Sequence, residues 1–176
     1  RLIAVPMAIN DTTINVEGAV STPYIDMTLK TLERFGVKVM YNEGDYTQFY
    51  IEGNQQYEAI DYTIESDWSA AATIMVAAAI AGEVTLHNIS TLSRQADTAI
   101  CRALERAGAS IVIESDSITV AHRPLTAFTF DATQCPDLFP ALVALAATAE
   151  GVSTLYGIDR LRGKESDRGE VLCEEY

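Results

Sequence analysis

The pentapeptides LERFG (Leu32–Gly36) and LERAG (Leu104–Gly108) differ at one position and mark an internal repeat. Each is followed by two β-rich runs with turn-forming residues between them: Val37–Tyr41 and Gln48–Ile51 in the first copy, Ala109–Glu114 and Ser117–Val120 in the second. Turn residues between β-rich runs are typical of hairpins. The sequence therefore predicts a helix followed by a β-hairpin, made twice.

A second match extends the repeat in the other direction. GEVTL (Gly82–Leu86) and GVSTL (Gly151–Leu155) are separated by nearly the same interval as the two pentapeptides. An Ala-rich segment that we expect to be helical precedes each one, and a further strand precedes each helix: Tyr62–Glu65, Ser69–Ala81, Phe128–Asp131 and Phe139–Glu150. The repeating unit is βαβαββ. Helical crossovers join parallel strands and hairpins join antiparallel ones, so we predict an α/β fold with mixed sheets.

The repeat also predicts how the two ends of the chain relate to the unit. Arg1–Asn10 aligns with the middle and end of the Ala-rich helix, and Cys173–Tyr176 aligns with Leu104–Ala107. We therefore expect the chain to open inside a helix and to be an internal part of a longer protein.

The composition is that of a globular protein, and it argues against some classes of binding partner. The chain has 176 residues, is 48% hydrophobic and carries a formal net charge of −13. This acidity argues against binding to nucleic acid or to an anionic membrane. The longest apolar run, Ala70–Ala81, is too short to span a bilayer. Three scattered cysteines lack metal-type spacing, so we expect reduced thiols, a cytoplasmic location, and neither a metal nor a cofactor.

One cationic stretch stands out against this acidity. RLRGKESDR (Arg160–Arg168) holds four of the chain's 12 Lys and Arg residues. Arginine offers a planar fork for phosphate or carboxylate and lysine a point charge, which favours an anionic small-molecule site. A solvated helix start with alternating charge is the alternative on charge alone.

This stretch, after STLYGI, resembles the signature of the 5-enolpyruvylshikimate-3-phosphate (EPSP) synthase family. Other segments resemble the family's motifs in the same order: Gly18–Val37, Tyr62–Val84, Ser93–Asp97 and Cys135–Gly151. The resemblance implies an inside-out α/β barrel fold in which βαβαββ units form two lobes. It assigns residues 1–64 to the end of one lobe and 65–176 to the start of the other, with a hinge near Ile64–Asp67.

The resemblance also implies an activity. The family transfers the enolpyruvyl group of phosphoenolpyruvate to the 5-hydroxyl of shikimate 3-phosphate and releases phosphate. It implies a monomeric parent enzyme whose site forms by lobe closure, so that this chain alone is inactive. Two alternatives remain: a related enolpyruvyl transferase acting on UDP-N-acetylglucosamine, and a non-catalytic, repeat-built scaffold or binding module.

Two carboxylates are catalytic on this resemblance. Asp137, in PDLFP, matches the substrate-contacting carboxylate proposed as base for the 5-hydroxyl. Glu165 matches a carboxylate implicated in proton transfer. The structural alternatives are a helix-start carboxylate favoured by the helix dipole for Asp137, and a residue that orients its cationic neighbours for Glu165.

Four further residues bind substrate on the same resemblance. Ser21, Tyr24 and Lys164 match residues that bind shikimate 3-phosphate, and Arg168 matches one that binds phosphoenolpyruvate. Arg160 stands where some relatives carry Asn. We expect a structural role for three other residues of the motifs, with Asp67 as a helix cap: Asp67, Gln95 and Asp97.

Overall fold

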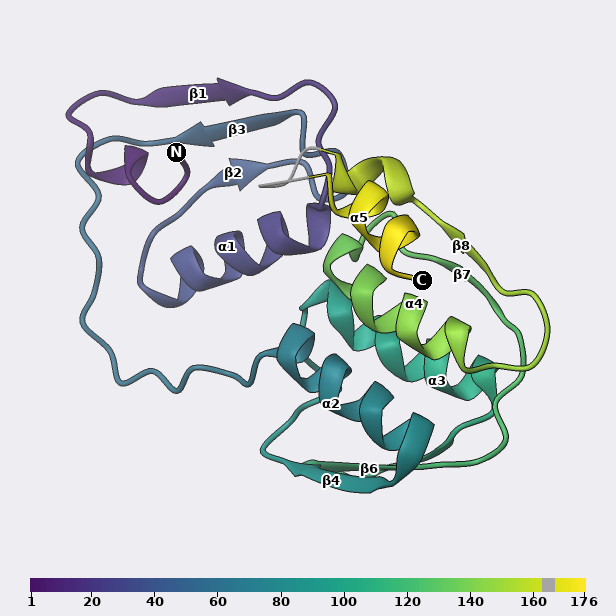
Figure 1. Cartoon of the computed structure of the whole chain (residues 1–176). Coiled ribbons are helices and arrows are strands. Elements are labelled where there is room, and N and C mark those ends of the chain that lie inside the picture. Colours follow the sequence, from purple (N-terminus) through teal and green to yellow (C-terminus); the bar gives the residue numbers. More distant parts are fainter. Residues whose placement is uncertain (163–166) are drawn as a thin grey trace. The chain divides into compact units, whose positions relative to one another are not determined.

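The computed structural model describes residues 1–162 and 167–176. The chain divides into two compact units, Arg1–Thr63 and Ile64–Tyr176 (Figure 1). Each unit has a hydrophobic core of its own. The division of the chain between two lobes of the family's fold stays a prediction.

The first unit is a three-stranded antiparallel sheet covered by one long helix. The sheet has the order β1-β3-β2, with Ile14 opposite Phe49. Helix α1 buries Leu29 and Leu32 and ends before Gly36, whose φ of +81° favours glycine. Its elements are η1 (Val5–Met7), β1 (Thr12–Asn15), α1 (Thr22–Arg34), β2 (Met40–Tyr41) and β3 (Gln48–Ile51).

The second unit packs three helices against one another and against two sheets. Helices α2, α3 and α4 are in mutual contact, with α2 on β4 and β6 and α3 on β5 (Figure 1). Strands β4, β6 and β5 form an antiparallel sheet in that order, and β7 pairs with β8 in parallel. The helices are α2 (Trp68–Ala81), η2 (Ala96–Ala99), α3 (Ile100–Ala107), η3 (Pro136–Leu138), α4 (Phe139–Ala147), η4 (Ile158–Leu161) and α5 (Arg168–Glu175). The strands are β4 (Glu83–His87), β5 (Ser110–Ile113), β6 (Ser117–Ala121), β7 (Thr129–Asp131) and β8 (Thr154–Tyr156).

The α/β fold class and the repeat are confirmed. Strand β1, helix α1 and the hairpin β2–β3 have the same order and pairing as β4, α3 and β5–β6. Both Ala-rich helices form, although α4 ends earlier than predicted, at Ala147. Within the described residues each sheet is purely parallel or purely antiparallel, so strand directions are mixed between sheets and not inside one.

Two local predictions are wrong. Tyr62–Glu65 forms no strand, and the ring of Tyr62 packs on Phe35 and Arg34 instead. The α-helix expected over Arg1–Asn10 is only the 3-10 turn η1. The carbonyl groups of Pro6 and Ala8 accept hydrogen bonds from the loop after β3, at 2.9 and 2.7 Å, which replace the bonds that a continuing helix would make.

Candidate functional site

Asp137 lies at the start of α4, on the short helix η3. The turn before η3 is closed by two backbone hydrogen bonds, from Cys135 to Ala132 at 3.0 Å and from Leu138 to Cys135 at 3.1 Å. Leu138 and Phe139 are fully buried, whereas the Asp137 side chain is 35% exposed. The fold therefore anchors the apolar residues of η3 and leaves this carboxylate accessible to a solute.

Arg168 is the partner of Asp137 across the second unit. It is the first residue of α5, and its Nη1 donates to Asp137 Oδ1 at 3.3 Å. Its side chain is 36% exposed. The structure thus brings together two of the predicted site residues from elements far apart in the sequence. An exposed pair of this kind contributes about 1 kcal/mol or less to stability, so it can open for a ligand at low cost.

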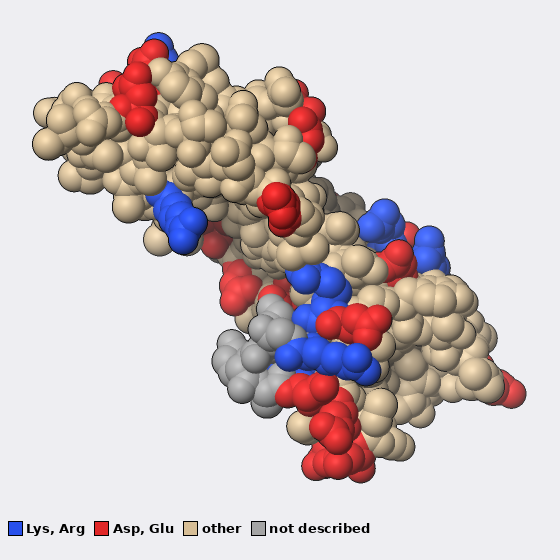
Figure 2. Space-filling view, turned by 90° about the horizontal axis from the view of Figure 1, so that it is seen from above, with Lys and Arg blue, Asp and Glu red and all other residues tan. Residues whose placement is uncertain are grey.

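Further charges of both signs surround this pair. Asp167 caps α5 through Gly169 and Glu170, both at 3.1 Å, and lies 4.0 Å from the Nε of Arg162. Arg160 donates from Nε to the carbonyl of Thr133 at 3.4 Å, in the turn that leads to η3. Figure 2 shows blue and red side chains lying side by side on part of the surface. Of the described residues in this stretch, Arg162 and Arg168 are therefore each paired with a carboxylate.

Two predicted site residues, Lys164 and Glu165, lie outside the described residues. Helix α5 begins at Arg168, and Asp167 before it has the non-helical backbone angles of an N-cap, with φ −72° and ψ 84°.

Ser21 and Tyr24 lie at the start of α1 in the first unit. Ser21 is the N-cap residue, yet its backbone is left-handed, with φ 56° and ψ 41°, and its side chain makes no capping hydrogen bond. The left-handed region is unfavourable for a residue other than glycine, and such strain gathers at functional sites. Tyr24 donates its backbone N–H to the Ser21 carbonyl at 3.0 Å. Ser21 is therefore not an ordinary side-chain N-cap.

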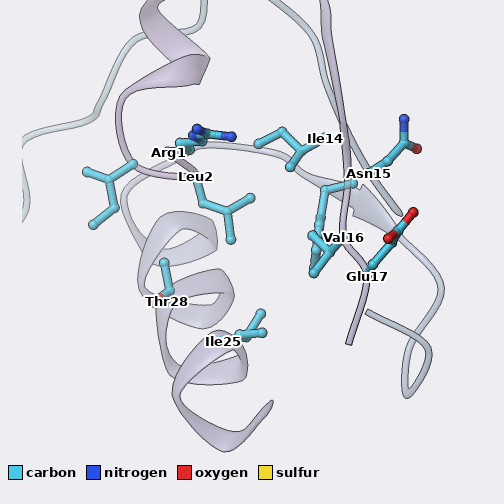
Figure 3. A pocket seen from close by; sticks show the side chains of 10 residues that line it. Arg1, Leu2, Ile14, Asn15, Val16, Glu17, Ile25 and Thr28 are labelled. Carbon is cyan, nitrogen blue, oxygen red and sulfur yellow. The ribbon is translucent and has the colours of Figure 1, made fainter. Parts of the chain in front are cut away.

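One described cavity differs in character from these charged positions. A cavity of about 610 Å³ in the first unit is mostly apolar, with Leu2, Ile14 and Ile25 extending toward one another in Figure 3. The polar ends of Asn15 and Glu17 point away from it. Neither Ser21 nor Tyr24 lines this cavity. It suits an apolar side chain or helix and not two anionic substrates.

Two hydrogen bonds of the Gln95 side chain, called here the Gln95 latch, fix the start of α2. Gln95 accepts from the Trp68 N–H at 2.9 Å and donates to the Ser66 carbonyl at 2.8 Å. Asp67 caps α2 by accepting from Ser69 and Ala70 at 2.8 and 3.3 Å, which confirms its predicted capping role. The Ser66–Ser69 and Ser93–Asp97 segments therefore form one structural junction.

The buried thiols are not nucleophiles at neutral pH. Burial, with the charge of Asp97 next in importance and Arg102 opposing it, raises the pKa of Cys135 to about 12. Burial also raises the pKa of Cys101 to about 11. The thiolate is the reactive form of cysteine, so both side chains act as core residues. Among residues 1–162 and 167–176, no group of three or more His, Cys, Asp or Glu side chains is placed to hold a metal ion.

No helix in the described part of the chain has the length and apolar character needed to cross a bilayer.

Comparison with known proteins gives the family. The family model for EPSP synthase (3-phosphoshikimate 1-carboxyvinyltransferase) matches residues 1–176. Curated 3-phosphoshikimate 1-carboxyvinyltransferases from Brachyspira hyodysenteriae and Methanosarcina acetivorans are 40% and 41% identical over 99% of this chain. The chain spans 42% of the length of each of these relatives.

Comparison with solved structures agrees with this family match. An EPSP synthase from Acinetobacter baumannii matches 98% of this chain with a TM-score of 0.77 and 28% identity, over 40% of its own length. The enolpyruvyl transferase NikO from Streptomyces tendae matches 83% of the chain over 35% of its own length, with a TM-score of 0.56 and 18% identity, and supports the fold alone. The chain belongs to the EPSP synthase (3-phosphoshikimate 1-carboxyvinyltransferase) family.

Proposed function

We propose that the complete protein carrying this chain transfers the enolpyruvyl group of phosphoenolpyruvate to the 5-hydroxyl of shikimate 3-phosphate and releases phosphate. The family match over the whole chain is the observation that carries the proposal. The contact of Asp137 with Arg168 supports it, because a base and an anion-binding group stand together on an accessible surface.

The chemistry assigns a task to each of these groups. The 5-hydroxyl oxygen loses its proton and bonds to the phosphate-bearing carbon of phosphoenolpyruvate, while the methylene carbon gains a proton and becomes a methyl group. Elimination then removes a proton from this methyl group, re-forms the carbon–carbon double bond and releases phosphate. Asp137 is proposed to take the hydroxyl proton and Glu165 to move the proton at the methylene carbon. Arg168 is proposed to bind phosphoenolpyruvate, because its guanidinium can pair with carboxylate or phosphate in a bidentate manner.

Shikimate 3-phosphate is assigned to the remaining predicted residues. Lys164 supplies a point charge, and Ser21 and Tyr24 supply hydroxyl groups at the start of α1. The left-handed backbone of Ser21 at this helix start supports the role. The first backbone N–H groups of a helix also favour an anion.

An assay of phosphate release tests the proposed function. The complete protein is expected to release phosphate only when both substrates are present. Phosphate release from phosphoenolpyruvate alone, or turnover with UDP-N-acetylglucosamine in place of shikimate 3-phosphate, would assign a different reaction. Absence of turnover with any of these substrates would favour a non-catalytic role.

We also propose that these 176 residues alone lack the activity, because they span only 42% of the curated relatives. Oriented reactants account for about 7–11 kcal/mol of such barriers, and orientation needs the whole site. Turnover by the isolated chain above that of its Asp137→Ala variant would contradict this. We further propose a cytoplasmic, monomeric protein, supported by its free cysteines and testable by fractionation and sedimentation.

A further inference from the structure

The start of helix α1 is less buried than the start of its counterpart in the second unit. In the alignment set by LERFG and LERAG, Ser21–Leu29 stands opposite Ser93–Cys101. Four residues of the second segment are buried in the core of their unit: Asp97, Ala99, Ile100 and Cys101. Residues 21–28 are all half-buried, and the buried residues of α1, Leu29 and Leu32, lie further along the helix. Packing therefore fixes the first helix start less firmly than the second.

A side-chain hydrogen bond joins the first helix start to the hairpin β2–β3. Tyr46, in the loop between the two strands, donates its hydroxyl to Asp26 Oδ2 at 2.8 Å. Asp26 lies in the second turn of α1, about 3 Å along the helix axis from Tyr24, since an α-helix rises about 1.5 Å per residue. The Tyr46–Asp26 bond therefore acts close to the start of the helix.

Tyr46 is itself fixed on the sheet. Its ring stacks on that of Tyr41 with 6.5 Å between the ring centroids, and Tyr41 packs on Phe49 at 5.8 Å. Phe49 is 1% exposed and belongs to the core of the first unit. The carbonyl of the next residue, Thr47, accepts the Val16 N–H at 2.8 Å. The Tyr46 hydroxyl is therefore a well-defined point of attachment for α1.

The backbone at Tyr46 is unfavourable for a residue of this type. Its φ is 51°, in the left-handed region that favours glycine. Such a conformation persists where the surrounding contacts hold it in place. The stacked ring and the hydrogen bond to Asp26 are contacts of this kind, and they bring the hydroxyl to the helix.

The tyrosine–carboxylate pair belongs to one copy of the repeat. In the alignment of β3 with β6, Ser115 stands opposite Tyr46. In the alignment of α1 with α3, Thr98 stands opposite Asp26. The pair thus occurs in the copy whose helix start is half-buried and carries predicted site residues.

The bond leaves the opposite side of the helix start uncovered. With 3.6 residues per turn, Tyr24 and Asp26 point about 200° apart around the helix axis. The Tyr24 N–H donates to the Ser21 carbonyl at 3.0 Å, and the Thr28 hydroxyl donates to the Tyr24 carbonyl at 3.0 Å. These bonds join the first turns of α1 into one body, so a bond at Asp26 also fixes Ser21 and Tyr24.

We propose that Tyr46 and Asp26 are positioning residues for shikimate 3-phosphate, because their hydrogen bond sets where the start of α1 presents Ser21 and Tyr24. The proposal rests on the proposed function, in which those two residues bind this substrate. A binding segment that is ordered before the ligand arrives does not lose affinity to its own ordering. The Tyr46–Asp26 bond supplies this order without burying the helix start.

The main variant is Tyr46→Phe in the complete protein, which keeps the ring on Tyr41 and removes the hydroxyl. We expect the KM for shikimate 3-phosphate to rise about fivefold, because the helix start must then be ordered on binding. The KM for phosphoenolpyruvate and kcat should stay within about twofold of the wild-type values, as expected when only binding of one substrate is weakened.

A matched control removes the same kind of hydrogen bond elsewhere in the sheet. Tyr50 on β3 donates its hydroxyl to Asp11 Oδ2 at 2.8 Å, and Asp11 directly precedes β1. Tyr50→Phe should therefore leave both KM values and kcat unchanged. A rise in the KM for shikimate 3-phosphate as large as that in Tyr46→Phe would indicate general destabilisation of the unit.

Variants of the carboxylate remove the same bond from the side of the helix. Asp26→Ala should raise the KM for shikimate 3-phosphate as much as Tyr46→Phe does, and the double variant should raise it no further, since both changes remove one interaction. Asp26→Asn keeps an acceptor for the Tyr46 hydroxyl and should stay near the wild type. Asp26→Ala decides the matter on its own if Tyr46→Phe does not fold.

Three kinetic results would overturn the inference. One is an unchanged KM for shikimate 3-phosphate in Tyr46→Phe or in Asp26→Ala. Another is an equal rise in the KM values of both substrates. The third is a double variant in which the effects of the two single changes multiply, because the two side chains would then act independently.

Hydrogen exchange separates failure of this inference from failure of the proposed function. Exchange of the backbone amides of residues 22–28 is followed by mass spectrometry in the ligand-free complete protein, without any turnover. We expect faster exchange in Tyr46→Phe and an unchanged rate in Tyr50→Phe, because local opening of α1 becomes easier only in the first. Unchanged exchange in Tyr46→Phe contradicts the inference even if the enzyme is active. Faster exchange in a protein whose wild type neither binds nor turns over shikimate 3-phosphate leaves the hold on α1 standing and rejects the function.

Discussion

Helices α2 and α4 occupy equivalent positions in the repeat. The start of each helix contacts the segment that follows the next strand along the chain, β4 after α2 and β8 after α4. At the start of α2 the contact is closed by an amide: Gln95 bonds to backbone groups of Ser66 and Trp68, and Trp68 is 1% exposed. At the start of α4 the contact is charged and open, between Asp137 and Arg168. The same backbone junction thus serves as a latch in one copy and as a candidate site in the other.

The difference shows that a repeat determines local geometry but not chemistry. Ser93–Asp97 and Arg162–Ser166 stand at the same interval as GEVTL and GVSTL, which places Gln95 opposite Lys164 in the alignment. In the first copy this position carries an amide that bonds backbone groups of the helix start. In the second it carries a cation, outside the described residues, where the helix start offers a carboxylate. Under the proposed function, substitution of a few side chains would convert a structural junction into an anion-binding one.

The largest expected effect on kcat comes from removing Asp137, the proposed general base of the charged junction. Asp137→Ala in the complete protein should lower kcat by about 10²- to 10⁴-fold, because a general base contributes that much to rate. Binding of shikimate 3-phosphate should weaken far less. Steady-state kinetics and calorimetry measure the two quantities. The matched control is Asp159→Ala, an exposed carboxylate paired with Arg162, which should leave kcat unchanged.

The next effect comes from the cation of the same junction. Arg168→Lys should raise the KM for phosphoenolpyruvate about tenfold, and that for shikimate 3-phosphate less, because lysine cannot reproduce a bidentate fork. Arg106→Lys is the control, since Arg106 donates to the Thr129 carbonyl and lies over the Phe130 ring. Equal increases in both KM values would remove the assignment of Arg168 to phosphoenolpyruvate.

The junction that Gln95 closes at the start of α2 should respond in stability and not in substrate binding. Gln95→Ala removes two hydrogen bonds and leaves a buried N–H unmatched, so the free energy of unfolding should fall by about 1–3 kcal/mol. Gln134→Ala, at an exposed position, should change it little. Urea unfolding measures both. A raised KM in Gln95→Ala with unchanged stability would mean that the first junction also contacts substrate.

The smallest effect concerns the first unit and depends on pH. Hydrogen bonds from the Gly53 N–H and the Tyr50 hydroxyl lower the pKa of Asp11 from 3.8. A lowered pKa contributes stability above the unfolded-state value, and this contribution is lost as the pH falls through the folded-state value. Asp11→Asn should therefore reduce stability slightly at neutral pH and make no difference below about pH 2. A difference that persists there would mean that packing and not charge is involved.

Much of the second unit could be predicted from sequence because its Ala-rich helices precede the matching segments GEVTL and GVSTL, and its hairpin follows LERAG, the second copy of LERFG. The Ala-rich helices and the hairpin β5–β6 were predicted within a few residues. The failures lie where tertiary contacts outweigh local preference. The ring of Tyr62 packs on the ring of Phe35, and no strand forms there. The Pro6 and Ala8 carbonyls accept hydrogen bonds from the loop after β3, and no longer helix forms there.

Prediction of the site was limited in a different way. The motifs pointed to Asp137 and Arg168, and the structure brings them within 3.3 Å. The hydrogen bond from Ser69 to Asp97 was not predictable, because the two residues lie on separate elements, α2 and η2, that meet only in the folded chain. The position of Asp97 in SRQAD, within the counterpart of the RGKES stretch, was the one available signal.

A structure of the complete protein with shikimate 3-phosphate bound tests the central claim most directly. We predict that the ligand's 5-hydroxyl lies within hydrogen-bond distance of the Asp137 carboxylate, at the charged junction, while the Gln95 latch stays closed. A ligand seated at the start of α2 or in the apolar cavity of the first unit, with Asp137 still bonded to Arg168 and facing solvent, would contradict it.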